Sequence, residues 1–165
     1  MPEFETVVVA TDGSESVERA VEVALDVAVR FDAAVHALYV VDETEVASSP
    51  ERVRDDMANA LQEAGGEAIV EVQRRAQELD AGGVTAVVRE GRPADEIVDY
   101  ARETDADLVA MGTRGRHGEN RFLIGSVAER VVRTCPVPVL TVRRLTTGES
   151  GHEHGRRVRQ AELRE

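Results

Sequence analysis

Residues 108–129 read LVAMGTRGRHGENRFLIGSVAE, an apolar run followed by a glycine-rich loop and the start of a helical pattern. The run at 108–111 contains no charged or hydroxyl side chain, as expected of a strand that helices cover on both faces. Ser126 is followed three residues later by Glu129, which predicts a capping box at the start of a helix. A buried strand, a loop and a helix in this order indicate a βα unit.

Four more apolar runs continue this pattern along the chain. Helical patterns separate them, and the runs occupy residues 6–10, 34–41, 84–88 and 137–142. The alternation predicts a three-layer, doubly wound α/β fold with a buried sheet of five parallel strands, forming one domain over residues 1–145. Pro138 cannot donate a ladder hydrogen bond, so the last strand should lie at a sheet edge or begin at this residue.

Four helices are expected between the strands. The first should be capped by Ser14, the third should open at Pro93, and the fourth should cover residues 127–133. The second should begin at Ser49 and Pro50, with Gly65 and Gly66 weakening its middle. Its inward side chains are predicted to be Val53, Met57, Ala60, Leu61, Ala64, Ala68, Val72, Ala76 and Leu79.

The charge of the chain is negative and unevenly spread. The formal net charge is −12, and all 20 basic residues are arginine because the sequence contains no lysine. Residues 1–104 carry 24 acids and 9 arginines, whereas residues 105–165 carry 8 acids and 11 arginines. This balance disfavours nonspecific nucleic-acid binding but tolerates a small anion in the second half. Abundant acid without lysine also suggests adaptation to high salt, a halophilic character.

Other compositional features narrow the class of protein. No apolar stretch is long enough for a membrane span and the N-terminus lacks a signal-peptide pattern, so we expect a cytoplasmic protein. Cys135 is the one cysteine, which excludes a disulfide within the chain and favours an inert, packed thiol. Residues 146–165 are rich in small and polar side chains and are expected to form a flexible tail.

The glycine-rich loop is a candidate phosphate site. Its glycines allow backbone amides to approach an anion, and the helix that follows presents its positive end. Arg114, Arg116 and Arg121 add positive charge. A glycine-rich loop with an ordinary helix cap remains the alternative.

Asp12 is the second candidate, at the end of the first strand. If the first and fourth strands are neighbours, Asp12 and Gly112 face one crevice at the point where the winding of the sheet reverses, the usual ligand site of such folds. The alternative is that Asp12 only forms a turn with its own backbone.

Several other sites are disfavoured. Without lysine there is no P-loop and no Schiff-base chemistry, and neither a dinucleotide fingerprint nor a serine nucleophile elbow occurs. His152 and His154 could hold a metal but fit a solvated tail better, and His36 fits a packed or edge position. His117 adjoins the loop without a visible carboxylate partner, so no catalytic residue is assigned.

These motifs together resemble the ATP-binding group of the universal stress protein family. The spacing of Gly112, Gly115, Gly125 and Ser126 is similar to the family's ATP-binding motif. Residues 11–14 and 136–140 fit the same family, and the resemblance covers about residues 4–144. It implies an adenine nucleotide alpha hydrolase-like sheet ordered 3-2-1-4-5, which makes the first and fourth strands neighbours.

The resemblance also implies a ligand and a set of contacts. ATP, with Mg²⁺, is expected to bind, with Asp12 and the Val40 backbone at the adenosine. Gly112 and Gly115 would meet the ribose and inner phosphates, and Gly125 and Ser126 the outer ones, near Arg116. The remaining lining residues would be Ala10, Thr11, Met111 and Val127. Glu119, unusual for the family, could weaken phosphate binding or help hold Mg²⁺.

A nucleotide-dependent regulatory role in the stress response is therefore the leading hypothesis, because it requires no catalytic residue. The resemblance further implies a homodimer formed through the last strand, between Val137 and Val142. The alternatives are a slow ATPase or phosphotransfer enzyme of the same fold, and a dimeric interaction module that binds no nucleotide.

Overall fold

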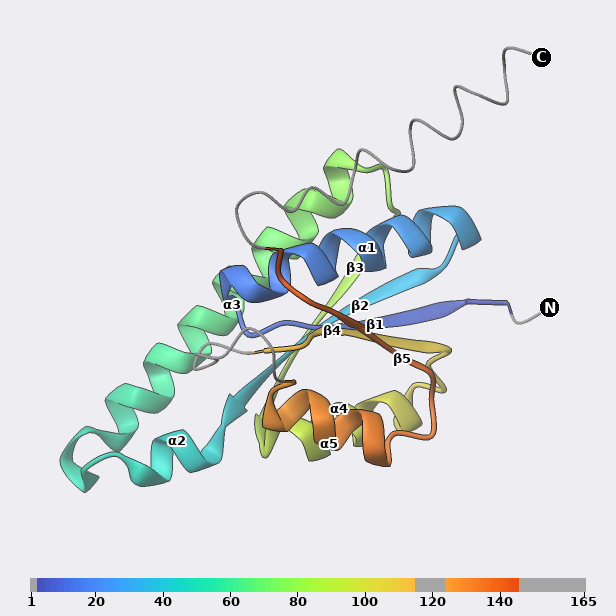
Figure 1. The fold of residues 1–165 in the computed structure, drawn as a ribbon. Helices are drawn as coiled ribbons and strands as arrows, with labels where there is room; N and C mark the ends of the chain where they lie inside the picture. Colours follow the sequence, from blue (N-terminus) through green and yellow to red (C-terminus); the bar gives the residue numbers. More distant parts are fainter. Residues whose placement is uncertain (1–2, 115–123, 146–165) are drawn as a thin grey trace, which may run out of the picture.

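The computed structural model describes residues 3–114 and 124–145, which form a five-stranded parallel sheet with helices on both faces (Figure 1). The strand order is β3-β2-β1-β4-β5, which confirms the predicted order. The strands are β1 (Thr6–Ala10), β2 (Ala34–Asp42), β3 (Val84–Gly91), β4 (Leu108–Gly112) and β5 (Val139–Val142). The central strands β1 and β4 are almost wholly buried, as their apolar runs predict.

Two helices pack on each face of this sheet, giving the three predicted layers (Figure 1). The helices α1 (Glu15–Phe31) and α3 (Arg54–Glu78) cover one face, and α4 (Pro93–Glu103) and α5 (Ser126–Thr134) cover the other. A short helix, α2 (Glu43–Ser48), and a 3₁₀ turn, η1 (Glu51–Val53), join β2 to α3. None of the helices in the described parts of the chain combines the length and apolar character needed to cross a bilayer.

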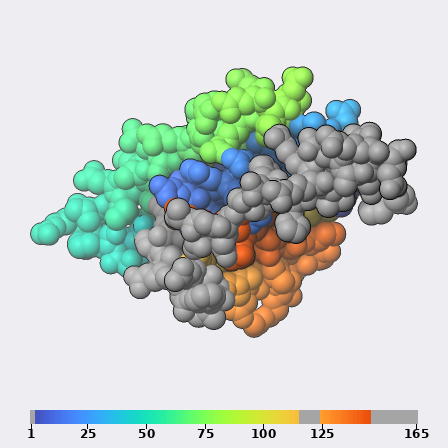
Figure 2. All heavy atoms as spheres, turned by 45° about the horizontal axis from the view of Figure 1, so that its top comes forward, coloured from blue at the N-terminus to red at the C-terminus, as the bar shows by residue number. Residues whose placement is uncertain are grey.

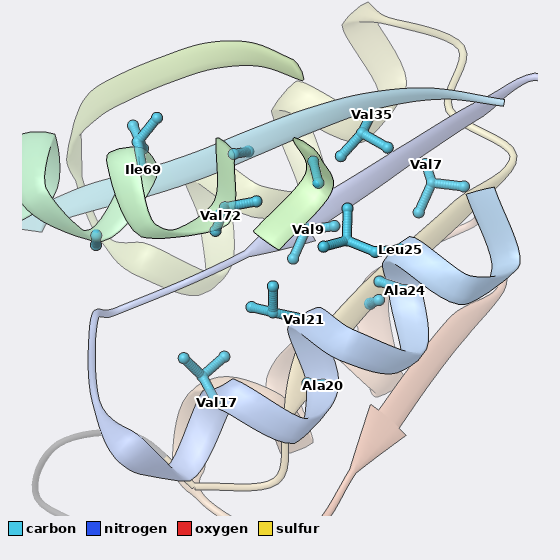
Figure 3. Packing of buried hydrophobic residues seen from close by; sticks show 14 of the residues in the cluster. Val7, Val9, Val17, Ala20, Val21, Ala24, Leu25, Val35, Ile69 and Val72 are labelled. Atoms are coloured by element: carbon cyan, nitrogen blue, oxygen red, sulfur yellow. The ribbon is translucent and has the colours of Figure 1, made fainter. Parts of the chain in front are cut away.

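Alternation along the strands divides the core into two clusters. Val7 and Val9 of β1 face α1 and α3, whereas Val8 between them faces α4 and α5. Figure 3 shows Leu25 of α1 pointing into the first cluster toward β1. Burial of one such valine or leucine stabilises the fold by about 1.5–3 kcal/mol relative to exposure. The periodic apolar residues of α1 therefore fix its face against the sheet.

The start of the second long helix differs from the prediction. The Ser49 hydroxyl donates back to the Glu45 carbonyl (3.1 Å) at the end of α2, so it does not cap a helix that begins at Pro50. Arg54 also donates to the Ser49 carbonyl (3.1 Å), and α3 begins at this arginine. The short helix α2 was not predicted; it starts where the Asp42 carboxylate accepts from the Thr44 amide (2.9 Å).

The inward face of α3 was predicted only in part. Leu61, Ala68, Val72 and Ala76 are buried as expected, and Ile69 and Gly65 join them. Ala60 is exposed, and Leu79 is 42% exposed because it is the C-cap, beyond the last helical turn. Gly65 is buried against the Tyr39 ring, where a Cβ atom would come within 2.6 Å of Cδ1. This glycine therefore lets α3 approach β2 closely.

The two sheet edges also differ from the expected pattern. The last strand begins at Val139, after Pro138, whose carbonyl accepts from the Val109 amide (2.9 Å). Its edge position is confirmed. At the opposite edge, the residues of β3 are exposed or half-buried except for Gly91, so the prediction of a sheet buried throughout is wrong there. Cys135 is half-buried at the C-cap of α5.

Candidate functional site

A cavity of about 280 Å³ opens at the carboxyl ends of β1 and β4. These strands are paired in parallel, with Val9 opposite Ala110, so the residues that follow them lie at the same edge of the sheet. Here β1 leads to α1 on one face, whereas β4 leads to α5 on the other. The cavity thus occupies the point where the winding reverses, the usual place for a ligand in this architecture.

The structure gathers nearly all the predicted binding residues around this cavity. Its lining includes Ala10, Thr11, Asp12, Val40, Met111, Gly112, Gly125, Ser126 and Val127. Gly115 and Arg116 lie outside the described residues, as do His117 and Glu119. The contacts of all these residues with a ligand stay a prediction.

Five further apolar residues of the cavity wall were not predicted from the sequence. Val17, Leu38, Pro93, Ile97 and Ala128 also line the cavity. Pro93 and Ile97 come from α4, which follows β3 and reaches the cavity beneath β2. The one available signal was position, because the chain after each parallel strand returns to this edge of the sheet.

Asp12 belongs both to a tight turn and to the cavity wall. Its Oδ1 atom accepts from the Ser14 amide (2.9 Å) and from the Ser14 hydroxyl (2.6 Å). Ser14 occupies the predicted N-cap position of α1, but its side chain makes no capping bond because its hydroxyl donates to Asp12. Gly13 completes the turn at φ +75°, which favours glycine. The turn holds a carboxylate acceptor at the mouth of the cavity.

The two ends of the glycine-rich loop are hydrogen-bonded to each other. The Gly125 amide donates to the Thr113 carbonyl (2.5 Å), and the Thr113 amide donates to the Val142 carbonyl of β5 (3.2 Å). Gly112 lies so close to α1 that a Cβ atom there would be 3.3 Å from the Ser16 carbonyl oxygen. The residues on either side of the loop, Thr113 and Gly125, are therefore held together at the cavity wall.

The start of α5 corrects the predicted capping box. Gly125 is the N-cap and Ser126 is the first helical residue, with no side-chain capping bond. The Glu129 side chain pairs instead with Arg133 (2.5 Å). The first amides of a helix have no intrahelical partners, so those of α5 meet the cavity uncapped by a side chain. Because α4 and α1 also begin at this edge, three helix dipoles favour an anion here.

A second hollow, of about 300 Å³, lies between α1 and α3 on the other side of the Asp12 turn. Its rim includes Glu18, Glu67 and Glu71, and Arg75 pairs with two of them, at 3.7 Å from Glu18 and 3.0 Å from Glu71. Hydrogen bonds from Arg74 and Arg75 lower the pKa of Glu71 to about 2. Figure 2 shows α1 and α3 side by side at the surface. The acidic rim makes this hollow unsuited to anions.

Potential metal ligands are sparse. Within residues 3–114 and 124–145, no three His, Cys, Asp or Glu side chains gather as a metal site. His36 is a half-buried residue of β2, an inner strand, and forms a hydrogen bond with the Tyr100 hydroxyl of α4 (2.7 Å). Of its two predicted positions, the packed one is therefore confirmed.

Comparison with known proteins places these features in context. The model of the universal stress protein family matches residues 3–143. The chain is 40% identical over 142 residues to universal stress protein MJ0531 of Methanocaldococcus jannaschii, covering 86% of this chain and 83% of that protein.

Solved structures of universal stress proteins have a similar fold. The universal stress protein UspA from Lactobacillus plantarum has a TM-score of 0.75 at 26% identity, covering 86% of this chain and 99% of that one. A universal stress protein in complex with cAMP has a TM-score of 0.64 at 29% identity, covering 86% and 98%.

Proposed function

This chain belongs to the universal stress protein family, and from that premise we propose that its cavity binds ATP as a regulatory ligand in the stress response. One observation carries the proposal: the Asp12 turn and the uncapped start of α5 line the same cavity. A nucleotide needs both an acceptor for its sugar or base and donors for its phosphates. The similar structure that contains cAMP supports a nucleotide of this class.

The polarity of the lining suggests the orientation of the ligand. Val40, Ile97 and Met111 offer an apolar surface for the adenine, and Asp12 offers an acceptor for donor groups of the adenosine. Ser126 and Val127, the first residues of α5, offer backbone amides without intrahelical partners to the phosphates, and Gly112 and Gly125 allow the phosphates to approach the backbone closely. We extend the phosphate site to Gly115 and Arg116 from their place in the glycine pattern. Mg²⁺ would be held mainly by phosphate oxygens and water.

A regulatory role is supported by the link between the loop and the edge strand. Thr113 bonds to Gly125 at the cavity and to Val142 at the end of β5. Phosphates that bind beside Thr113 and Gly125 would therefore act directly on β5, the edge through which we propose a homodimer. Sedimentation of the protein with and without ATP tests this link, and a monomer under both conditions would contradict it.

Gly125 offers a sharp test of nucleotide binding. Its φ of −69° is accessible to any residue, and Asp and Asn are both favoured N-caps, so Gly125→Asp and Gly125→Asn should both fold. The two variants have the same shape, but only the aspartate places a negative charge where the phosphates would lie.

We expect gently purified wild-type protein to release an adenine nucleotide on denaturation, and added ATP to raise its melting temperature. ATP at 100 times its Kd should stabilise the folded state by about 2.7 kcal/mol. Gly125→Asn should keep most of this effect and Gly125→Asp should lose it. Wild-type protein with neither released nucleotide nor ATP stabilisation would refute the proposal.

A further inference from the structure

Arg114 is unusual among the arginines of this protein. It lies two residues after Gly112, lines the cavity and is half-buried. The other half-buried arginines of the described chain all have partners. Arg75 and Arg89 each pair with two or more carboxylates, and Arg19 donates to the Arg143 carbonyl (3.0 Å). Within residues 3–114 and 124–145, Arg114 has no hydrogen bond or ion pair.

A partly buried cation without a partner is costly, because it loses hydration and gains no compensating charge. In a chain with 32 acidic residues, carboxylates are available almost everywhere on the surface. Even so, the described cavity wall contains one carboxylate, Asp12, and neither a hydrogen bond nor an ion pair joins it to Arg114. Among the described residues Arg114 thus has no counter-ion, and the anionic group of a ligand would take that place.

The position of Arg114 identifies the part of the ligand that it would meet. The bond between the Thr113 carbonyl and the Gly125 amide holds the residue before Arg114 against the start of α5. Arg114 and the first residues of α5 therefore line the same end of the cavity. A formal net charge of −12 repels polyanions as a whole, so a highly charged ligand needs such a local cation.

We infer that Arg114 makes the cavity selective for the number of phosphates, so that ATP binds more tightly than AMP or cyclic AMP. This inference rests on the proposed nucleotide-binding function and specifies its ligand. The adenosine end of the cavity treats these nucleotides alike, and the guanidinium gains more from a longer and more highly charged phosphate chain. A hydrogen bond from a charged donor changes affinity by about tenfold or more.

The test compares four proteins against adenosine, AMP, cyclic AMP and ATP. Calorimetric titrations in EDTA at one fixed salt concentration give the affinities of wild type, Arg114→Gln, Arg114→Lys and Arg102→Gln. Arg102 is the matched control, because it is exposed on α4, has no partner among the described residues and does not line the cavity. Its replacement removes the same formal charge.

We expect Arg114→Gln to weaken ATP binding about tenfold while changing adenosine, AMP and cyclic AMP affinities by less than about twofold. Arg114→Lys should recover part of the ATP preference, and Arg102→Gln should leave it intact. Equal loss for all ligands, no loss for ATP, or wild-type binding of cyclic AMP as tight as ATP would each overturn the inference. Absence of any nucleotide binding by the wild type would instead refute the proposed function.

Discussion

Two adjacent glycines in α3 allow a stringent test of how this helix packs on the sheet. Gly65 and Gly66 have the same intrinsic helix propensity, and replacement of either by alanine should favour the helix by about 1 kcal/mol. Their surroundings differ completely. A Cβ atom on Gly65 would lie 2.6 Å from Cδ1 and 3.0 Å from Cε1 of Tyr39, whereas one on Gly66 meets nothing within 4 Å.

The expected change in stability follows from these distances. Tyr39 is 0% exposed, so its ring cannot move aside into solvent, and overpacking of this kind costs about 1–3 kcal/mol. After the gain in helix propensity, Gly65→Ala should still destabilise the fold by up to about 2 kcal/mol, whereas Gly66→Ala should stabilise it by about 0.5–1 kcal/mol. Because both variants share the gain in helix propensity, the overpacking cost of about 1–3 kcal/mol separates them, and their melting temperatures should differ by roughly 2–12 °C for a chain of this size.

Urea unfolding followed by circular dichroism measures both variants against the wild type. A change in the midpoint with an unchanged slope would locate the effect in the native state. If Gly65→Ala were as stable as Gly66→Ala, the close packing of α3 on β2 would be incorrect.

Three further predictions concern the sheet, pH and salt. Asp107→Ala should destabilise the fold by about 1–3 kcal/mol in urea, because the Asp107 carboxylate accepts from the amides of Glu5 and Thr6, both at 2.9 Å; an unchanged midpoint would contradict this. Hydrogen bonds from Arg74 and Arg75 lower the pKa of Glu71 to about 2 in the folded protein. The ionised side chain therefore stabilises the folded state fully above the ordinary carboxyl pKa, and this stabilisation is lost as the pH falls toward 2. The stability difference between wild type and Glu71→Gln should therefore narrow between about pH 5 and pH 2, and a constant difference would refute it. The acidic composition predicts a higher melting temperature in molar KCl than in dilute buffer, and equal values would count against halophilic adaptation.

The fold was predictable because its strongest signals are local. The apolar runs in β1 and β4 could only be buried strands, and the helical spacing in α1 left one possible inward face. The strand order, in contrast, came from the family resemblance, because periodicity does not reveal which strands are neighbours. That order makes β1 and β4 neighbours, so it predicts that Asp12 and Gly112 line the same cavity.

Helix starts were predicted wrongly where two local hydrogen bonds compete for the same side chain. Burial was missed where it depends on a residue far away in the sequence. Ser49 could cap a following helix or close the preceding one, and its bond to Glu45 selects the second. Ser126 and Glu129 have the capping-box spacing, but α5 begins one residue earlier, at the end of the bond between Thr113 and Gly125. The burial of Gly65 depends on Tyr39, and the lack of a partner for Arg114 among the described residues depends on side chains from several elements of the cavity wall.

The most direct test of the central claim is an NMR titration of isotope-labelled protein with ATP. We predict that the largest amide shifts occur at the carboxyl ends of β1 and β4 and at the start of α5, with Thr11, Gly112 and Ser126 among them. Saturable shifts confined to that edge of the sheet would support a nucleotide site there. No shifts with ATP, or shifts confined to the hollow between α1 and α3, would contradict it.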